Sequence, residues 1–163
     1  MLNSKQKGNL TELQCITSFY ELGYSVSIPY GENARYDFIA DVQGKLLRVQ
    51  VKTSSIAEDK SYIEFSCRSS RSNASGCYYR SYTSDEIDYF ATYYNGKCYL
   101  IPVRECSTTK KLRFTSPKNK QVVQINFAKD YELQVQLNKI IKHWKTNLYV
   151  VGSIPIVGTT ISR

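Results

Sequence analysis

The chain has 163 residues, the length of one ordinary domain, and 42% of them are hydrophobic, which is enough to form a core. Lysine and arginine outnumber aspartate and glutamate by 22 to 14. The resulting formal net charge of +8 favours a polyanionic partner, with nucleic acid ahead of an anionic membrane. The polar, basic N-terminus and the lack of a long apolar run predict no signal peptide and no membrane span, so we expect a cytoplasmic protein.

The first predicted element is a helix over residues 3–22, capped by Asn3 or Ser4. Its apolar face repeats at helical spacing through Cys15, Ile16 and Phe19. Glu12 lies on or beside that face, where a carboxylate is costly unless it is paired or bound to a metal; the alternative is an edge position that reaches solvent. Gly8, one turn earlier, predicts a close approach to the helix backbone.

Two strands and a tight turn follow. Residues 36–42 and 46–53 are rich in β-branched and aromatic side chains, and the Gln-Gly link at 43–44 predicts a two-residue hairpin turn. With that turn, Val42 pairs with Lys45, and every pair further along the hairpin is fixed.

The predicted register gathers three polar side chains on one face. Counting outward from the turn, Asp37 falls opposite Gln50, with Cβ atoms roughly 5 Å apart, and Lys52 shares their face. A carboxylate, a second oxygen ligand and a lysine can together hold a hard divalent cation beside a hydrolytic water. The alternative is the solvated face of a half-exposed sheet, and a loop of odd length would destroy the alignment.

Further strands over 24–28 and 62–67 are expected to complete a four-stranded core sheet. Thr83 and Glu86 fit a capping box, which predicts a short helix over residues 84–91.

The last third of the chain predicts strands over 97–103, 109–114 and 122–125, and then a helix from Asn126 to about residue 144. Its apolar stripe is expected to form core or a subunit interface, and consists of Leu133, Leu137, Ile140, Ile141 and Trp144.

Two basic stretches, near 68–80 and 108–120, are candidate DNA-contact loops. Arginine can read guanine edges, and small polar side chains can reach phosphates or bases. The alternatives are a mobile surface loop for the first and a solvated charged face for the second. The expected DNA-contacting residues are Arg35, Arg68, Ser69, Arg71, Asn73, Tyr78, Arg80, Lys110, Lys111, Arg113, Lys118 and Lys120.

The five cysteines are odd in number and have no CxxC spacing, and the chain has a single histidine, His143. Reduced thiols in a cytosolic protein explain this composition better than a disulfide framework or a zinc site. The cysteines are Cys15, Cys67, Cys77, Cys98 and Cys106.

The chain resembles the PD-(D/E)XK nuclease superfamily, in which an acidic residue, a spacer across a hairpin and an acid-X-lysine triplet follow a helix. The matching residues are Asp37, then Gln50-Val51-Lys52, with Glu12 on the preceding helix. The proline before Asp37 is missing, and Gln50 stands in place of the acid. Within the superfamily, the chain is most similar to homing endonucleases of bacterial group I introns, over roughly residues 5–143.

The resemblance implies an α/β, restriction-endonuclease-like core with a mixed sheet flanked by helices, in one domain over residues 1–144, followed by a tail (145–163) of unknown role. It implies a Mg²⁺-dependent endonuclease for double-stranded DNA, with Mn²⁺ as a substitute. Asp37 would be the principal metal ligand, Gln50 a neutral second ligand and the Val51 carbonyl a third. Lys52 would orient the attacking water, and Glu12 would hold a metal-bound water or a second metal.

Cutting both strands of a duplex with one site per chain predicts a homo-oligomer, either a dimer or a tetramer. Two other interpretations remain open. One is a different nuclease of the superfamily, such as a Holliday junction resolvase or a restriction enzyme. The other is a DNA-binding module with a decayed site, because an amide replaces the acid at Gln50.

Overall fold

A computed structural model describes residues 1–31, 33–116 and 125–151. The chain begins with helix α1 (Ser4–Glu21), which starts at a capping box: Asn3 Oδ1 accepts from the Gln6 N–H at 2.9 Å, and the Asn3 N–H donates to Gln6 Oε1 at 3.0 Å. Gly23, with φ at 83°, follows the helix in the left-handed conformation that glycine adopts without strain. The predicted first helix is therefore confirmed.

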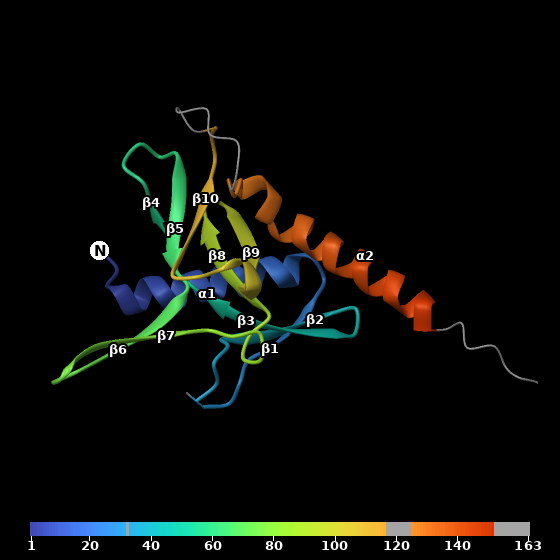
Figure 1. Ribbon diagram of the computed structural model, residues 1–163, viewed down its shortest axis with the longest axis horizontal. Coiled ribbons are helices and arrows are strands. Elements are labelled where there is room, and N and C mark those ends of the chain that lie inside the picture. Colours follow the sequence, from blue (N-terminus) through green and yellow to red (C-terminus); the bar gives the residue numbers. More distant parts are fainter. Residues whose placement is uncertain (32, 117–124, 152–163) are drawn as a thin grey trace, which may run out of the picture.

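The central sheet has five strands in the order β1-β2-β3-β8-β9. Strands β3 and β8 run parallel and the other neighbours are antiparallel, so the sheet is mixed, as expected. In Figure 1, α1 crosses the sheet and the second long helix, α2 (Leu133–Val151), lies beside β9. The strands are β1 (Ser25–Ser27), β2 (Phe38–Val42), β3 (Lys45–Val51), β8 (Tyr89–Tyr94) and β9 (Lys97–Pro102).

The predicted hairpin register between β2 and β3 is confirmed. Gln43 and Gly44 both have positive φ, at 55° and 86°, as a type I′ turn requires. Val42 pairs with Lys45, and the ladder continues outward to its last pair, Phe38 with Val49.

The two faces of the central sheet pack against different layers. On one face, apolar side chains of β2 and β3 pack with both long helices, including Phe19 of α1 and Leu137 of α2, which are fully buried. On the other face, Phe90 and Ile101 pack against a small second sheet of order β10-β5-β4. Its strands are β4 (Ser55–Ile56), β5 (Tyr62–Ser66) and β10 (Thr109–Arg113).

The prediction of a four-stranded core sheet that includes residues 62–67 was wrong. Strand β5 forms, but it pairs with β4 and β10, and the free edge of β3 is taken by β8. Ile63 and Phe65 of β5 are buried between the two sheets, so their alternation reflects packing across layers and not membership of the central sheet.

The helix predicted over residues 84–91 was also wrong. The N–H groups of Glu86 and Ile87 both donate to the Thr83 carbonyl at 3.1 Å, which makes a single turn. The chain then enters β8, whose Tyr-Phe-Ala-Thr-Tyr-Tyr sequence favours a strand and pairs on both edges. The capping contact forms, because the Thr83 N–H donates to the Glu86 carboxylate at 3.2 Å, but the chain enters the β8 ladder before a helix begins.

Residues 68–81 form a two-stranded hairpin and not the expected loop. Strands β6 (Arg68–Asn73) and β7 (Gly76–Ser81) pair only with each other, and the hairpin projects from the body of the molecule (Figure 1). Every residue from 70 to 81 is exposed.

The C-terminal helix begins later than predicted. Two short 3-10 turns, η1 (Val103–Glu105) and η2 (Ala128–Tyr131), precede α2 (Leu133–Val151). Asn126 is not a helix cap, because its side-chain oxygen accepts from Lys110 Nζ at 2.9 Å and from the Tyr131 hydroxyl at 2.8 Å.

The apolar stripe of α2 is confirmed as core, since Leu133, Leu137 and Ile140 are buried. Nearly all of the strand predicted over 122–125, together with Lys118 and Lys120, lies outside the described residues. Among the described helices, none is long and apolar enough to cross a membrane.

Leu137→Ala should lower the free energy of unfolding by about 2–5 kcal/mol, because Leu137 is fully buried between α2 and the sheet and its truncation leaves a cavity. Urea unfolding followed by circular dichroism measures this change. Leu13→Ala, on the exposed side of α1, is the matched control and should change stability by less than about 0.5 kcal/mol. Equal losses in the two variants would contradict the packing described here.

Candidate active site

Asp37 and Gln50 are in direct contact at the open end of the β2–β3 hairpin. Gln50 Nε2 donates to Asp37 Oδ2 at 2.7 Å, and the backbone N–H of Val51 donates to the same oxygen at 2.6 Å. The Asp37 N–H donates to the Val49 carbonyl at 2.9 Å, which extends the hairpin ladder to this point. The prediction that Asp37 and Gln50 share a face is therefore confirmed.

The amide of Gln50 lies between two oxygens. Its nitrogen is 2.7 Å from Asp37 Oδ2 and 3.2 Å from the Val51 carbonyl oxygen. Two oxygen acceptors around one end of an amide require its NH₂ group there, since an oxygen in that place would be repelled. A cation held by the same two oxygens would instead favour the amide turned with its oxygen inward.

The donor set fits a hard divalent cation in its chemistry. Asp37 supplies a carboxylate and Val51 a carbonyl, and Gln50 can supply an amide oxygen, all of which are ligands that Mg²⁺ accepts. Among the described residues, no cluster of three or more His, Cys, Asp or Glu side chains could hold a metal. Neutral oxygens would therefore have to complete any coordination shell here.

The two carboxyl groups of this site, Asp37 and Glu12, are destabilised in their charged form. Burial raises the pKa of Asp37, although the Val51 N–H, the charge of Lys52 and the Gln50 amide each lower it. Burial also raises the pKa of Glu12, and the negative charge of Asp37 raises it further. Glu12 is half-buried beside the apolar face of α1, as the helix pattern predicted, and its charge interacts with that of Asp37.

Lys52 follows β3 directly and points toward the β6–β7 hairpin. Its backbone N–H donates to the Ala91 carbonyl at 2.9 Å, while Nζ donates to the Arg68 carbonyl at 3.2 Å and to the Tyr82 hydroxyl at 3.4 Å. Burial lowers the pKa of Lys52, the charge of Asp37 raises it, and the charge of Arg35 lowers it. The ammonium therefore lies in the electrostatic field of Asp37.

Gly8 does not have the predicted role within the protein. Apart from its chain neighbours and the backbone of its own helix turn, no described atom lies within 4 Å of the position that a Cβ would take there, so the space beside this turn of α1 is open.

The predicted DNA-contacting residues separate into groups. The exposed ones on the hairpin are Arg71, Asn73, Tyr78 and Arg80, and Arg68 and Ser69 are half-buried at its root. On β10, Lys111 is exposed and pairs with Glu64 at 3.4 Å, and Arg113 is half-buried.

Two other residues predicted to contact DNA interact with side chains inside the protein. Lys110 is buried, and its ammonium donates to the Glu105 carbonyl, the Asn126 side chain and the Tyr131 hydroxyl. Arg35 is half-buried and pairs with Glu86 at 3.1 Å. Burial thus removes Lys110 from the predicted DNA surface, while a DNA contact by Arg35 stays a prediction.

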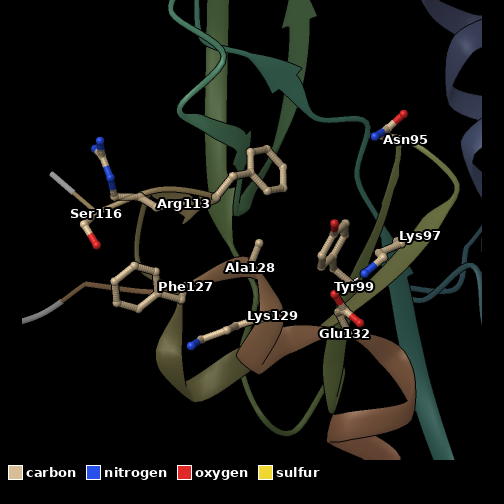
Figure 2. A pocket seen from close by; sticks show the side chains of 10 residues that line it. Asn95, Lys97, Tyr99, Arg113, Ser116, Phe127, Ala128, Lys129 and Glu132 are labelled. Carbon is tan, nitrogen blue, oxygen red and sulfur yellow. Dashed lines mark hydrogen bonds and ion pairs between the residues drawn. The ribbon is translucent and has the colours of Figure 1, made fainter.

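A hollow of about 470 Å³ lies away from this site (Figure 2). It is lined by residues of β9, β10, η2 and their flanks, among them Tyr99, Arg113 and Glu132. It shares no residue with the constellation around Asp37, so it contributes nothing to the chemistry described here.

Comparisons with protein families and with solved structures both found matches. A family model described as PD-(D/E)XK endonuclease matches residues 2–134. The solved structure of a bacterial homing endonuclease, I-Ssp6803I, is similar to this chain with a TM-score of 0.68 and 24% sequence identity; the match covers 86% of this chain and 99% of that one. At this identity, the likeness establishes the fold. No curated protein matches the sequence.

Asp37→Asn should raise the free energy of unfolding of the metal-free protein at neutral pH. Because burial raises the pKa of Asp37, the folded state binds its proton more tightly than the unfolded chain does. Wild-type stability therefore falls as pH rises from the ordinary value of 3.8 through the folded pKa, and the cost is fully present above it. Urea unfolding in EDTA across this pH range should show that the free energy of unfolding of Asp37→Asn exceeds that of wild type at neutral pH, and that the difference disappears in acid. A variant less stable than wild type at neutral pH would contradict the burial cost.

Proposed function

Because this chain belongs to the PD-(D/E)XK endonuclease family, we propose that it is a site-specific endonuclease for double-stranded DNA of the intron homing type, dependent on Mg²⁺ or Mn²⁺. The observation that carries the proposal is the contact between Asp37 and Gln50 at 2.7 Å, with the charge of Lys52 close enough to lower the pKa of Asp37. These residues combine oxygen ligands for a metal ion with an ammonium group, that of Lys52, which can face a phosphate.

The metal would be held by the Asp37 carboxylate, the Val51 carbonyl and the side-chain oxygen of Gln50 once its amide has turned. When bound, the cation would polarise the scissile phosphate and make a water more acidic. Asp37 and Glu12 interact unfavourably without a cation, so their charges favour the bound state. Glu12 would hold a water on the side of the site formed by α1.

Lys52 would orient the attacking water and stabilise negative charge that develops on the phosphate. Its ammonium lies in the field of Asp37 and is held by two neutral oxygens, the Arg68 carbonyl and the Tyr82 hydroxyl. Among the described residues it forms no direct ion pair, so its charge is not neutralised by a carboxylate in contact. Fixed cations aimed at developing charge are worth most where water is excluded, and Lys52 is half-buried.

The β6–β7 hairpin is the proposed reading element for DNA. A two-stranded ribbon fits the major groove, which is about 12 Å wide. The exposed Arg71 and Asn73 lie toward its tip, and Tyr78 is directly opposite Arg71 in the ladder. One site per chain cuts one strand, so cleavage of a duplex would use two chains of a dimer or tetramer.

A DNA-binding module without nuclease activity is the second candidate, and Gln50 is the observation that favours it. An amide that donates to Asp37 satisfies this carboxylate without any metal. Metal affinity would then be lower than in a site with two acids, and binding without cleavage would be the outcome.

Lys52→Ala should abolish DNA cleavage and leave DNA affinity within about threefold, because Lys52 would be one among many contacts to phosphates and the other contacts stay in place. The measurement is Mg²⁺-dependent cleavage of a supercoiled DNA library that contains intron-insertion junctions, with Asp37→Asn as a second variant and EDTA as the metal-free control. Discrete linear products from wild type alone would support the proposal. Cleavage at the wild-type rate by Lys52→Ala would remove this residue from the mechanism. Salt-dependent binding without cleavage would favour the second candidate.

Arg71→Ala should weaken binding to the cleaved site by about 1–3 kcal/mol and relax its specificity, if this exposed arginine reads a base. Fluorescence anisotropy with matched and single-substituted duplexes measures both effects. Lys142→Ala removes the same charge from the exposed surface of α2 and should change affinity much less. Equal effects of the two substitutions would indicate that the hairpin contributes only non-specific positive charge and does not read the DNA sequence.

A further inference from the structure

The root of the β6–β7 hairpin holds the ammonium of Lys52. Nζ donates to the carbonyl of Arg68, the first residue of β6, and to the hydroxyl of Tyr82, the first residue after β7. It also lies 4.9 Å from the centroid of the Tyr82 ring. Lys52 leaves the central sheet, but both partners that fix its charged end belong to the projecting hairpin.

Tyr82 is fixed on the side of the core. Its ring packs edge-on against Phe90, with centroids 5.3 Å apart and planes at 86°. Phe90 is fully buried in β8, the strand that pairs with β3 in the central sheet. Tyr82 therefore connects the root of the hairpin to the strand next to the active-site hairpin.

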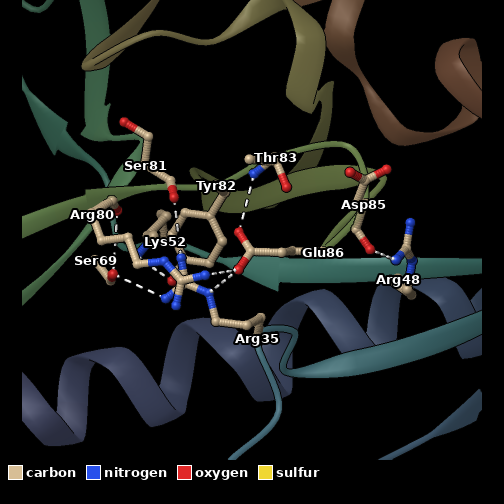
Figure 3. Close-up of polar contacts among 10 residues, drawn as sticks. All are labelled: Arg35, Arg48, Lys52, Ser69, Arg80, Ser81, Tyr82, Thr83, Asp85 and Glu86. Atoms are coloured by element: carbon tan, nitrogen blue, oxygen red, sulfur yellow. Dashed lines mark hydrogen bonds and ion pairs between the residues drawn. The ribbon is translucent and has the colours of Figure 1, made fainter.

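Arg35 fixes the Tyr82 ring by cation–π contact and binds both strands of the root. The guanidinium carbon lies 4.0 Å from the Tyr82 ring centroid. Nη1 donates to Ser69 Oγ of β6 at 3.0 Å, and Nη2 donates to the Ser81 carbonyl of β7 at 3.3 Å. Figure 3 shows these side chains around Lys52. All three nitrogens of the guanidinium are occupied, since Nε donates to Glu86.

Glu86 balances the positive charge of this cluster. It pairs with Arg35 at 3.1 Å and with Arg80 of β7, and it accepts from the Thr83 N–H at 3.2 Å. Arg35 and Arg80 thereby share one half-buried carboxylate. It offsets their positive charge in a region where the charge of Arg35 already lowers the pKa of Lys52.

We propose that Tyr82 and Arg35 are positioning residues for Lys52, and that they couple the catalytic ammonium to the orientation of the β6–β7 hairpin. The inference rests on the proposed nuclease function. Bound DNA that reorients the hairpin moves Arg68, Ser69 and Ser81, and with them the two oxygens and the aromatic ring that hold Nζ. DNA recognition at the tip of the hairpin is then coupled to the placement of the Lys52 ammonium at the phosphate.

The position of Lys52 can be measured without DNA. In protein labelled with ¹³C-lysine, the Cε–Hε signal of Lys52 is identified by its loss in Lys52→Arg, and the Tyr82 ring current displaces it. Tyr82→Phe keeps the ring and removes the hydroxyl, while Arg35→Met removes the guanidinium that holds the ring. Both should shift or broaden the Lys52 signal. Tyr94→Phe removes a hydroxyl from a tyrosine packed against the same core and should leave the signal unchanged.

The same variants separate positioning from binding. At saturating DNA, Tyr82→Phe and Arg35→Met should slow single-turnover cleavage by about 10- to 100-fold, because a displacement of about 1 Å is enough for that loss, while the Kd for DNA stays within about threefold. Tyr94→Phe should retain the wild-type rate.

An unchanged Lys52 signal in both variants would overturn the proposal, as would a loss of affinity with an unchanged cleavage rate. Absence of cleavage by the wild-type protein would instead count against the nuclease function. The ¹³C signals would still decide whether Tyr82 and Arg35 position Lys52, so the two failures are distinguishable.

Discussion

The register of one hairpin determines where the chemistry of this protein lies. A two-residue turn with positive φ at Gln43 and Gly44 sets the ladder between β2 and β3, and that ladder brings Asp37 and Gln50 into contact. A shift of one residue would move Gln50 and Lys52 to the opposite face of the sheet, into the apolar layer beneath the helices. The Val51 N–H reinforces the register, because it donates to the Asp37 carboxylate. The site is therefore a consequence of turn geometry and not of a flexible loop.

The fold holds charged side chains at the candidate active site, where burial destabilises their charged forms. Burial raises the pKa values of Asp37 and Glu12, and the charge of Asp37 raises that of Glu12 further, while the neighbouring Lys52 ammonium is itself half-buried. A protein selected only for stability would gain little from such a cluster, since charges with incomplete partners destabilise the folded state. Gln50 relieves part of the cost by donating to Asp37, which an acid at this position could not do when ionised. The same amide leaves the site with less negative charge for a cation.

Local rules were enough to predict the first helix, the Gln-Gly turn and the polar face that it creates, because capping and positive-φ turns depend on neighbouring residues. They failed where distant segments compete. Residues 62–67 and 89–94 both have strand-forming side chains, and only packing between layers decides which of them pairs with β3. Lys110 and Lys111 are adjacent and alike in the sequence, yet one is buried and the other exposed. Tyr82 is one of fourteen tyrosines, and nothing local marks it as the partner of Lys52.

Calorimetric titration of the DNA-free protein with Mg²⁺ tests most directly whether this register builds a metal site. Wild type should bind the ion through Asp37, Val51 and the turned amide of Gln50. Asp37→Asn should lose binding, and Gln50→Glu should bind more tightly because it restores a negative charge. An affinity unchanged by Asp37→Asn, or no binding by wild type and Gln50→Glu alike, would contradict the account.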